Sequence, residues 1–262
     1  MNLLQLKNIE VVFERNTNNE TPVFANFNLN IKRGQFISLV GSNGSGKTTL
    51  LNLIAGKIVP SRGSVLFAGK DITGLKEHER SRFMGRVFQD PALGTSPSMT
   101  ILENMALAGA KGHSFGLQRG IRKNKLDFYQ TRLEQLGLGL EDKFHAPVGS
   151  LSSGQRQALA LLICTLTPIE LLILDEHTAA LDPKTSETIM ELTDEIIKKQ
   201  GVTALMVTHN LRYAVKYGNR LLMLDKGKII IDAQGGKKNR LRVQDLVQVF
   251  GKLTPGLSYP AG

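Results

Sequence analysis

The segment Gly41–Thr49 constrains the fold of this 262-residue chain more than any other part of the sequence. It follows the apolar run Phe36–Val40, which is typical of a buried parallel strand, and precedes a helical pattern, Leu50–Ala55, that ends at a glycine. Glycines allow the backbone to bend so that several N–H groups point at one anion, to which the new helix adds its positive N-terminal end. A glycine turn with a surface lysine is the alternative, but it leaves the strand before the segment and the helix after it unexplained.

The same segment fits the pattern G-x-x-x-x-G-K-[ST], the Walker A phosphate-binding loop of nucleoside triphosphatases. Lys47 would supply a positive charge to the outer phosphates, and the Thr48 hydroxyl would reach a magnesium ion. We therefore expect ATP and Mg2+ as cofactors. The residues expected to bind the nucleotide here are Gly41, Ser42, Asn43, Gly44, Ser45, Gly46, Lys47, Thr48 and Thr49.

The cysteine content and the apolar runs indicate which cellular compartment suits the chain and whether it spans a membrane. The single cysteine, Cys164, excludes an internal disulfide, suits a reducing cytosol, and is expected to be a buried small apolar residue. No secretory signal is expected at the start of the chain. The longest apolar run, Ala158–Leu174, is interrupted by Pro168 and Glu170 and is shorter than the roughly 20 residues that cross a bilayer. We expect a chain that does not span a membrane by itself.

The net charge of +10 is compatible with nucleic acid, an anionic membrane surface, or simply a basic surface. The densest basic groups are Arg119–Lys125 and Lys237–Arg242. Neither is interleaved with aromatic residues, so stacking on bases is unsupported. The pattern favours a protein close to an anionic leaflet over one that binds nucleic acid.

The N-terminal part predicts two strands, at residues 3–13 and between Phe24 and Ile31, which we expect to be antiparallel and peripheral. Phe13 stands at the end of the first strand. It could stack on an adenine ring or be an ordinary core phenylalanine, and the residues alone leave both open. Further strands are predicted at Gly63–Phe67 and Arg86–Gln89.

Residues 100–166 contain helical patterns with no strand between them. Thr100 and Glu103 form a capping box for a helix that runs through Ala108. Further helices are predicted at Lys123–Leu136 and Ser152–Leu166, after a glycine-rich basic link, Gly109–Gly120. Such an insertion into a strand-bearing chain indicates a helical subdomain.

The alternation of strands and helices then resumes. Asp182 is expected to cap a helix that has Pro183 at its first position and Gly201 just past its end. The other expected strands are Leu171–Leu174, Thr203–Val207, Leu221–Leu224 and Ile229–Ile231, and the other expected helices are Leu211–Tyr217 and Val243–Phe250. A tail with Pro255 and Pro260 is expected to be loose.

Two carboxylates, Asp175 and Glu176, directly follow the apolar run Leu171–Leu174. This places them at the carboxyl end of a buried strand, where open parallel sheets bind ligands. Asp175 could hold the magnesium ion, and Glu176 could orient or deprotonate an attacking water. A strand that ends in a solvated acidic turn is the alternative, and it is much weaker in a chain that also has the phosphate loop.

The segment Leu151–Gln155 combines a second capping box, Ser152 with Gln155, and a glycine, Gly154, that leaves the backbone bare at a helix start. It is a second candidate for an anion at a helix terminus. An ordinary helix cap is the alternative, and the local residues require nothing more.

The order of these motifs resembles the nucleotide-binding subunit of an ATP-binding-cassette (ABC) transporter. The resemblance rests on the phosphate loop, Gln89, the LSSGQ of 151–155, the LLILDE of 171–176, the AALD of 179–182 and the lone His209, and it covers residues 4–232. It implies an α/β fold of the P-loop NTPase type, with a mixed central sheet, a peripheral antiparallel β subdomain and an inserted helical subdomain. It also implies a Mg-dependent ATPase coupled to transport.

The resemblance implies a role for each matched position. Phe13 would stack on adenine; Gln89 would sense magnesium and water and link to the membrane partner; His209 would contact the terminal phosphate and support hydrolysis, with Glu176. The residues expected to contact ATP on the opposite subunit or to cross the dimer interface are Ser152, Ser153, Gly154, Gln155 and the segment 179–182 with Asp182. The expected metal ligands are Thr48, Gln89 and Asp175.

The resemblance further implies one ABC ATPase domain over residues 1–262. Within it, 1–89 and 167–240 would form a RecA-like core with the antiparallel β part, 90–166 the helical subdomain, and 241–262 a C-terminal helix and tail. Two copies would form a homodimer that works with separate transmembrane permease subunits and, indirectly, with an extracytoplasmic substrate-binding protein. The expected location is the cytoplasmic face of the cell membrane, with no nucleic-acid partner.

Two departures from the family pattern stand out. Ser153 replaces a usual glycine and should be tolerated if its φ is negative. His177 replaces a common proline after Glu176 and is given no catalytic role. The segment Val87–Thr95 and Gln244–Leu246 are similar to importers linked to aromatic amino acids. A soluble ABC ATPase that acts on DNA or ribosomes, and a binding-only regulatory cassette, are the competing functions.

Overall fold

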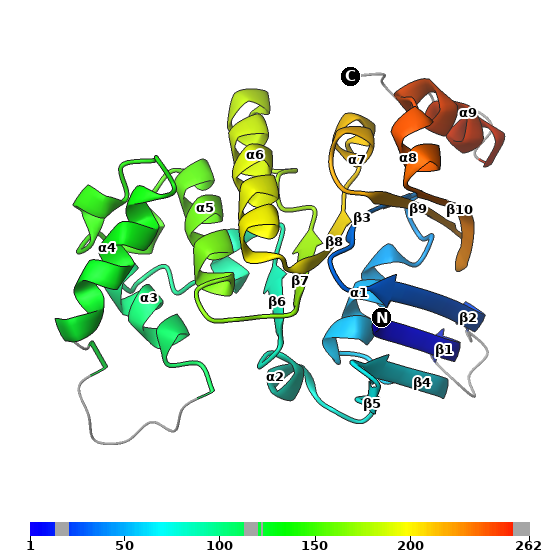
Figure 1. The fold of residues 1–262 in the computed structure, drawn as a ribbon, viewed down its shortest axis with the longest axis horizontal. Coiled ribbons are helices and arrows are strands. Elements are labelled where there is room, and N and C mark those ends of the chain that lie inside the picture. Colours follow the sequence, from blue (N-terminus) through cyan, green and yellow to red (C-terminus); the bar gives the residue numbers. More distant parts are fainter. Residues whose placement is uncertain (14–20, 113–119, 122, 254–262) are drawn as a thin grey trace. The chain divides into compact units, whose positions relative to one another are not determined.

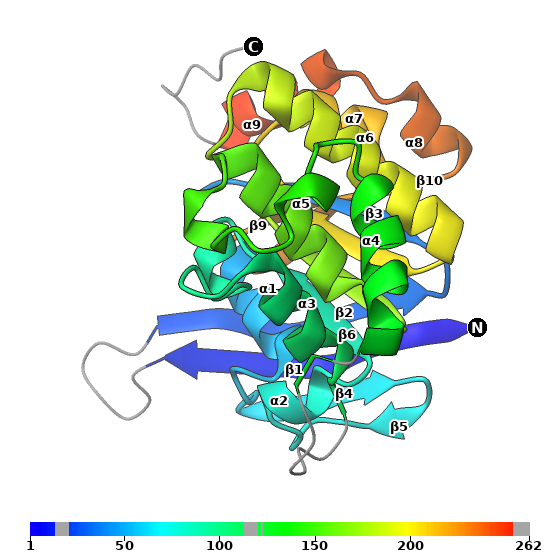
Figure 2. The ribbon, with the colours of Figure 1, turned by 90° about the vertical axis from the view of Figure 1, so that its left-hand side faces the viewer.

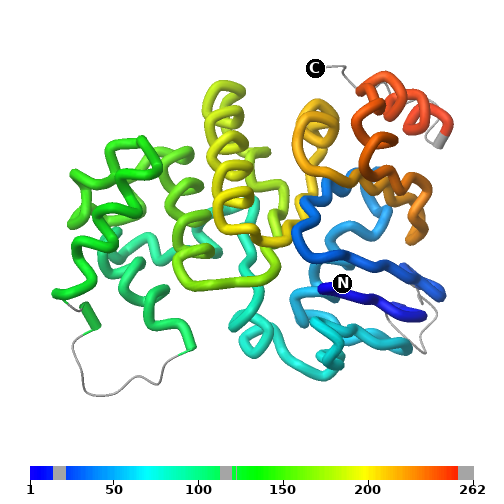
Figure 3. Tube along the Cα trace, in the orientation of Figure 1, coloured from blue at the N-terminus to red at the C-terminus, as the bar shows by residue number. Residues whose placement is uncertain are grey.

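The computed structural model describes residues 1–13, 21–112, 120, 121 and 123–253. The residues outside the description include 14–20, between the two predicted N-terminal strands, and the central part of the predicted link 109–120. They also include Arg119 and Arg122 of the first basic group, and the predicted tail from 254 on. The chain divides into two compact units, one made of Met1–Ser81 with the residues from Gly201 on, the other of Arg82–Gln200. Figure 3 shows the chain leaving the first unit and later returning to it.

An antiparallel sheet forms one layer of the first unit (Figure 1). Its strand order is β2-β1-β4-β5, and every pairing in it is antiparallel. Leu4, Leu6 and Ile9 of the long first strand are fully buried, as expected where one face of a sheet packs on a core. The antiparallel pairing of the two N-terminal strands is therefore confirmed. The bounds are β1 (Asn2–Phe13), β2 (Thr21–Lys32), β4 (Arg62–Phe67) and β5 (Lys70–Asp71).

A second sheet in the same unit contains the strand that precedes the phosphate loop. β3 (Phe36–Gly41) pairs in parallel with β8 (Thr203–Val207) and with β9 (Arg220–Asp225), and β10 (Lys228–Gln234) pairs with β9 in antiparallel fashion. All residues of β3 and β8 are buried, which explains their continuous apolar sequences. The mixed sheet is as predicted.

Helices complete the first unit. α9 packs through Leu246 and Phe250 onto a buried cluster that includes Val40 and Met223 of the sheet. The short helices α2 and α8 were not predicted from sequence. The bounds are α1 (Lys47–Ala55), α2 (Glu77–Arg80), α7 (Leu211–Lys216), α8 (Gly236–Arg240) and α9 (Val243–Leu253).

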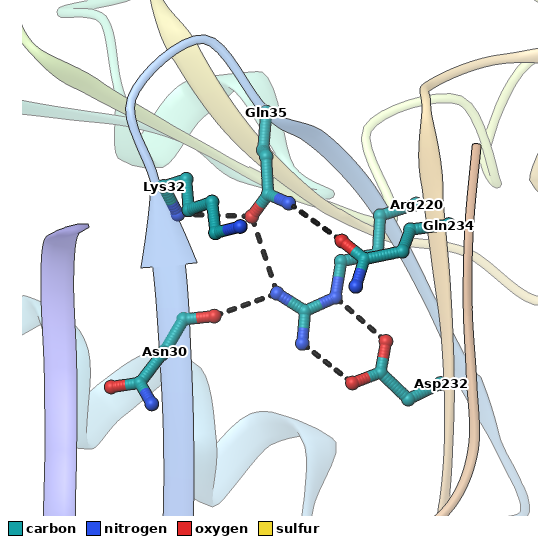
Figure 4. A network of polar contacts seen from close by, with 6 residues as sticks. All are labelled: Asn30, Lys32, Gln35, Arg220, Asp232 and Gln234. Carbon is teal, nitrogen blue, oxygen red and sulfur yellow. Dashed lines mark hydrogen bonds and ion pairs between the residues drawn. The ribbon is translucent and has the colours of Figure 1, made fainter. Parts of the chain in front are cut away.

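Arg220 links the two sheets of the first unit. Its guanidinium makes two hydrogen bonds to Asp232, at 2.8 and 2.7 Å, and donates to the carbonyl oxygen of Asn30 at 2.6 Å. It also donates to Gln35 Oε1 at 3.2 Å. Figure 4 shows how Gln35 extends this network to Lys32 and Gln234. A buried guanidinium with this many acceptors fixes β9 against β2.

The second unit contains two parallel strands and a set of helices. β6 (Met84–Val87) pairs with β7 (Leu171–Asp175). α5 contacts α3, α4 and α6, and these helices lie side by side in both views (Figures 1 and 2). The predicted helices are confirmed with small shifts at their ends. The bounds are α3 (Ile101–Gly109), α4 (Leu126–Glu134), α5 (Ser153–Cys164) and α6 (Pro183–Gln200).

Cys164 ends α5 and is half-buried, less completely than its apolar neighbours suggest. Its sulfur would lie 2.5 Å from a Cβ on Gly85, so β6 has a glycine where this thiol packs. Burial raises the pKa of the Cys164 thiol to about 12, which makes it unreactive. In the part of the chain that the structure describes, the helices lack the length and hydrophobicity needed to cross a membrane.

Candidate functional site

The phosphate loop joins β3 to α1 through glycines in left-handed conformations. Gly44 has φ of 74° and Gly46 has φ of 105°. The left-handed backbone therefore requires glycine at Gly46, and a Cβ there would also crowd the ring of Phe24 at 3.1 Å. α1 begins at the next residue, so its N-terminal N–H groups and its positive dipole end face the loop.

Lys47 is buried and closes the loop on itself. Its ammonium donates hydrogen bonds to the carbonyl oxygens of Gly41 at 2.7 Å and Ser42 at 2.9 Å. These bonds hold the positive charge inside the curve of the loop, beside Asn43 and Gly44, which are exposed. A phosphate that enters the loop would meet a charge that is already in position.

Ser45 carries a buried polar atom that the protein does not satisfy. Its side-chain hydroxyl is inaccessible to solvent and has no hydrogen-bond partner among the described residues. An unmet buried hydroxyl costs about 1–3 kcal/mol, so Ser45 is a point of stored strain in the loop. The groups that fit an anionic ligand are the buried ammonium of Lys47, the loop glycines and the N-terminus of α1.

The turn between β9 and β10 supports the loop from behind. Gly227 donates its backbone N–H to the carbonyl oxygen of Ser45 at 3.0 Å, and the Ser42 hydroxyl lies 3.3 Å from Asp225 Oδ1. Gly227 has φ of 73°, and a Cβ there would collide with the carbonyl oxygen of Val23. The sequence places this turn between two predicted strands but does not indicate its contact with a loop about 180 residues earlier.

His209 lies two residues past the end of β8 and is exposed. β8 is the parallel neighbour of β3, with Val207 opposite Leu39, so His209 and the phosphate loop leave the same edge of the sheet. Phe13, at the end of β1, is 40% exposed, so it is available to a ligand rather than packed in the core. Its role as an adenine platform stays a prediction.

In the second unit, Asp175 ends β7 and forms an ion pair that the sequence did not suggest. Arg86 Nη2, on the neighbouring strand β6, lies 2.7 Å from Asp175 Oδ2. The same guanidinium stacks over the ring of Phe88 at 4.8 Å. The candidate metal ligand is thus held by a protein cation.

Glu176 has a backbone conformation that is rare outside glycine, with φ of 49°. Such strain costs on the order of 1 kcal/mol and is concentrated at functional sites. The next residue, His177, is almost completely buried, and the carbonyl oxygen of Glu176 accepts the N–H of Ala179 at 2.9 Å. The turn after β7 therefore fixes the position of the backbone of Glu176, whose side chain is half-buried.

Gln89 follows β6 and is exposed. The residue before it, Phe88, accepts a hydrogen bond at its carbonyl oxygen from Gln157 Nε2 at 3.2 Å. Gln157 is a buried residue of α5. The loop that carries Gln89 is therefore tied to the helix that begins at the LSSGQ segment.

The capping box at the start of α5 is confirmed. Ser152 Oγ accepts the N–H of Gln155 at 3.2 Å, and Gln155 Oε1 accepts the N–H of Ser152 at 3.3 Å. Ser153 is the first helical residue, is exposed, and is not among the described residues with positive φ. Serine therefore causes no backbone strain there.

Gly154 is buried where α5 approaches α6. A Cβ on Gly154 would collide with the methyl carbon of Thr185. At the start of α6, Asp182 Oδ1 accepts the N–H of Thr185 at 3.0 Å, and hydrogen bonding from Thr185 lowers the pKa of Asp182. Asp182 is exposed and caps its helix as predicted.

No cluster of three or more His, Cys, Asp or Glu side chains within the described ranges could hold a metal by itself. The predicted ligands Thr48, Gln89 and Asp175 offer oxygen atoms, which magnesium prefers. Magnesium commonly takes only one or two protein oxygens and completes its shell with phosphates and water. Each of these oxygen donors therefore has the chemistry that suits a magnesium ion arriving with a nucleotide.

The chain is similar to known proteins over most of its length. The model of the family described as "ABC transporter" matches residues 24–179. A tyrosine transport ATP-binding protein of Clostridioides difficile is 44% identical over 248 residues, which cover 95% of this chain and 98% of that protein. The methionine import ATP-binding protein MetN of Haemophilus influenzae is 30% identical and aligns with 98% of this chain and 72% of its own length.

Solved structures of ATP-binding cassettes are also similar to this chain. The dimeric cassette MJ0796, bound to ADP and phosphate after hydrolysis, is 28% identical, with a TM-score of 0.75, over 88% of this chain and 98% of that one. The cassette MJ1267 in its ADP conformation is 25% identical, with a TM-score of 0.78, over 97% of each chain.

Proposed function

This chain belongs to the ABC transporter family as an ATP-binding subunit, and we propose that it hydrolyses ATP to drive an importer whose membrane subunits are separate chains. The observation that carries this proposal is the Gly41–Thr49 loop. It combines a buried ammonium, left-handed glycines and a helix N-terminus. An anion with several oxygens, such as a triphosphate, interacts favourably with all of these groups at once.

The nucleotide is held by the residues of this loop, with Phe13 stacked on the adenine. Thr48, Gln89 and Asp175 would hold Mg2+, which when bound neutralises part of the phosphate charge. Lys47 withdraws its hydrogen bonds from the Gly41 and Ser42 carbonyls in favour of the outer phosphates. Because the ammonium is already buried, this exchange requires little new desolvation.

Hydrolysis depends on Glu176 and His209. Glu176 orients the attacking water and accepts its proton as the water oxygen bonds to the terminal phosphorus, and the bond to the ADP oxygen breaks. His209 donates a hydrogen bond to the terminal phosphate, which gains charge as the reaction proceeds. The positive φ of Glu176 supports this assignment, since backbone strain of this kind is concentrated at functional sites.

Two copies act as a homodimer. Ser152, Ser153, Gly154 and Gln155 contact the ATP of the opposite copy, and the segment ending at Asp182 crosses the interface. The dimeric state of the related cassette MJ0796 supports this arrangement. We further propose that residues 90–166 are the helical subdomain, between RecA-like parts at 1–89 and 167–240, with 241–262 as a C-terminal extension.

Gln89 and the helical subdomain pass the motion to permease subunits at the cytoplasmic face of the membrane, and an extracytoplasmic binding protein delivers the substrate. The names of the relatives favour import over action on DNA or ribosomes. The similarity to a tyrosine transport protein supports an amino acid, of the aromatic class, as cargo.

The test is the substitution Glu176→Gln, with Glu195→Gln at an exposed position of α6 as the matched control. Glu176→Gln should bind ATP and dimerise but lose nearly all phosphate release, while Glu195→Gln keeps the activity of the unaltered protein. Unchanged hydrolysis in Glu176→Gln contradicts the assignment. No phosphate release by the unaltered protein, even with its permease, would make it a binding-only cassette.

A further inference from the structure

Arg86 forms an ion pair with Asp175, the carboxylate proposed above as a metal ligand. Its Nη2 atom lies 2.7 Å from Asp175 Oδ2, and the two side chains are only 11% and 20% exposed. They stand at the ends of adjacent parallel strands, where Val87 pairs with Leu174. At this distance and burial the pair is much less screened by water and salt than a surface ion pair.

A guanidinium and a divalent cation compete for the same carboxylate. Both are attracted to Asp175, and they repel each other when they share it, because neither can be neutralised by proton loss. The ring of Phe88, 4.8 Å from the Arg86 guanidinium carbon, gives the guanidinium a second favourable contact that does not depend on Asp175. Arg86 can therefore release the carboxylate without becoming an isolated buried charge.

We propose that Arg86 is a positioning residue that substitutes for the divalent cation on Asp175 until nucleotide and metal bind. Its ion pair keeps the half-buried carboxylate oriented and occupied, so that it is less available to other cations. Its release sets the metal affinity of the nucleotide complex. This inference rests on the proposed function, because it assumes that Asp175 faces a metal that arrives with ATP.

The test measures metal binding directly. Free Mn2+ is followed by electron paramagnetic resonance in protein saturated with a non-hydrolysable ATP analogue, and Mg2+ affinity follows by competition. Arg86→Met, which keeps much of the side-chain length but not the charge, should bind Mn2+ about tenfold more tightly. Arg86→Lys, which keeps the charge but not the planar guanidinium, should bind Mn2+ more weakly than Arg86→Met.

Arg62→Met is the matched control. Arg62 lies 3.7 Å from Glu10 in an ion pair on the protein surface, so its loss should not change Mn2+ affinity. Arg86→Gln, which is also uncharged but can still hydrogen-bond Asp175, should reproduce the tighter binding and covers the case in which Arg86→Met folds poorly. Equal or weaker Mn2+ binding in the uncharged variants overturns the proposal and leaves Arg86 as a structural partner of Asp175.

The two levels of failure are separable. Binding of the ATP analogue is first measured in EDTA, which removes divalent metal, so that nucleotide binding is measured separately from metal binding. If the unaltered protein binds no nucleotide there or with Mn2+, the proposed function fails. If it binds nucleotide and Mn2+ but the Arg86 variants show no tightening, only the role of Arg86 fails.

Discussion

His177 Nε2 lies 3.1 Å from Thr193 Oγ1, and both residues are buried. The Thr193 hydroxyl donates its one proton to the carbonyl oxygen of Ile189 at 2.7 Å. It can therefore only accept from the histidine, which makes Nε2 the protonated nitrogen of a neutral ring. The residue next to Glu176 is thus anchored to α6 in one tautomer.

This burial predicts a pH dependence of stability. Burial lowers the pKa of His177 from 6.5 to about 4. Between these pH values, His177 is therefore protonated in the unfolded chain and neutral in the folded chain. The stabilisation is complete above pH 6.5, and as the pH falls to 4 it is lost by an amount on the order of 3 kcal/mol. Urea unfolding at a series of pH values measures this slope.

The control for this prediction uses the exposed His145. His177→Gln should remove the part of the slope between pH 6.5 and 4, whereas His145→Gln should keep it. The carboxyls with lowered pKa values, Asp71, Glu103 and Asp182, remain in every variant and cancel in the comparison. An unchanged slope in His177→Gln would contradict the burial argument.

Arg80 is expected to be the most costly single charge to remove from the first unit. It is 1% exposed and donates to the carbonyl oxygens of Leu53, Ile54, Ile72, Thr73 and Leu75. Two of these end α1, the helix that begins at the phosphate loop. Arg80→Met removes all five of these side-chain hydrogen bonds and should lower the free energy of unfolding by at least about 3 kcal/mol.

Arg82→Met is the comparison for Arg80→Met, because Arg82 is exposed and only two residues away. It should change the stability by less than about 0.5 kcal/mol. Similar losses in both variants, measured by chemical unfolding, would show that the carbonyl contacts of Arg80 are not what stabilises the unit.

Gly154→Ala should destabilise the second unit through a clash rather than through backbone conformation. The added Cβ meets the Thr185 methyl carbon, and overpacking of this kind costs about 1–3 kcal/mol. Thr185→Ser removes that methyl group, so the double variant should recover most of the loss. Thermal unfolding of the unaltered protein, the two single variants and the double variant gives a double-mutant cycle. If the stability losses of the two substitutions simply add, the contact between Gly154 and Thr185 is not direct.

Lys47→Met should weaken ATP binding at least about tenfold and abolish phosphate release, because the buried positive charge of the loop is lost. Lys57→Met, just past the other end of α1 and exposed, should bind ATP as the unaltered protein does. Fluorescence titration with a labelled ATP analogue measures both. Equal binding by the two variants would remove Lys47 from the site.

Much of the fold follows from local pattern. The continuous apolar run of β3 predicts a strand buried on both faces, and the structure has all of its residues buried. Capping boxes at Thr100 and Ser152 correctly mark the starts of α3 and α5. The short helices α2 and α8 were missed because neither is long enough to show a periodic pattern.

The partners of the buried charges did not follow from pattern. Nothing near Arg86 in the sequence indicates Asp175, and nothing near Arg220 indicates Asn30 or Asp232. Lys238, predicted as part of a basic surface group, is instead buried and donates to the carbonyl oxygens of Val215 and Tyr217 near the end of α7. These pairings depend on which strands and helices become neighbours.

The sequence by itself determined the elements and the chemistry available at their ends, because helix starts, strand burial and the phosphate loop depend on residues close together in the chain. Only the tertiary structure decided which of the 33 lysines and arginines are surface charges and which, like Arg80 and Arg86, are fixed on buried acceptors. The reason is physical. A buried charge is stable only when its acceptors surround it, and acceptors such as Leu53 and Ile54 for Arg80, or Asp175 for Arg86, come from distant segments that folding brings together.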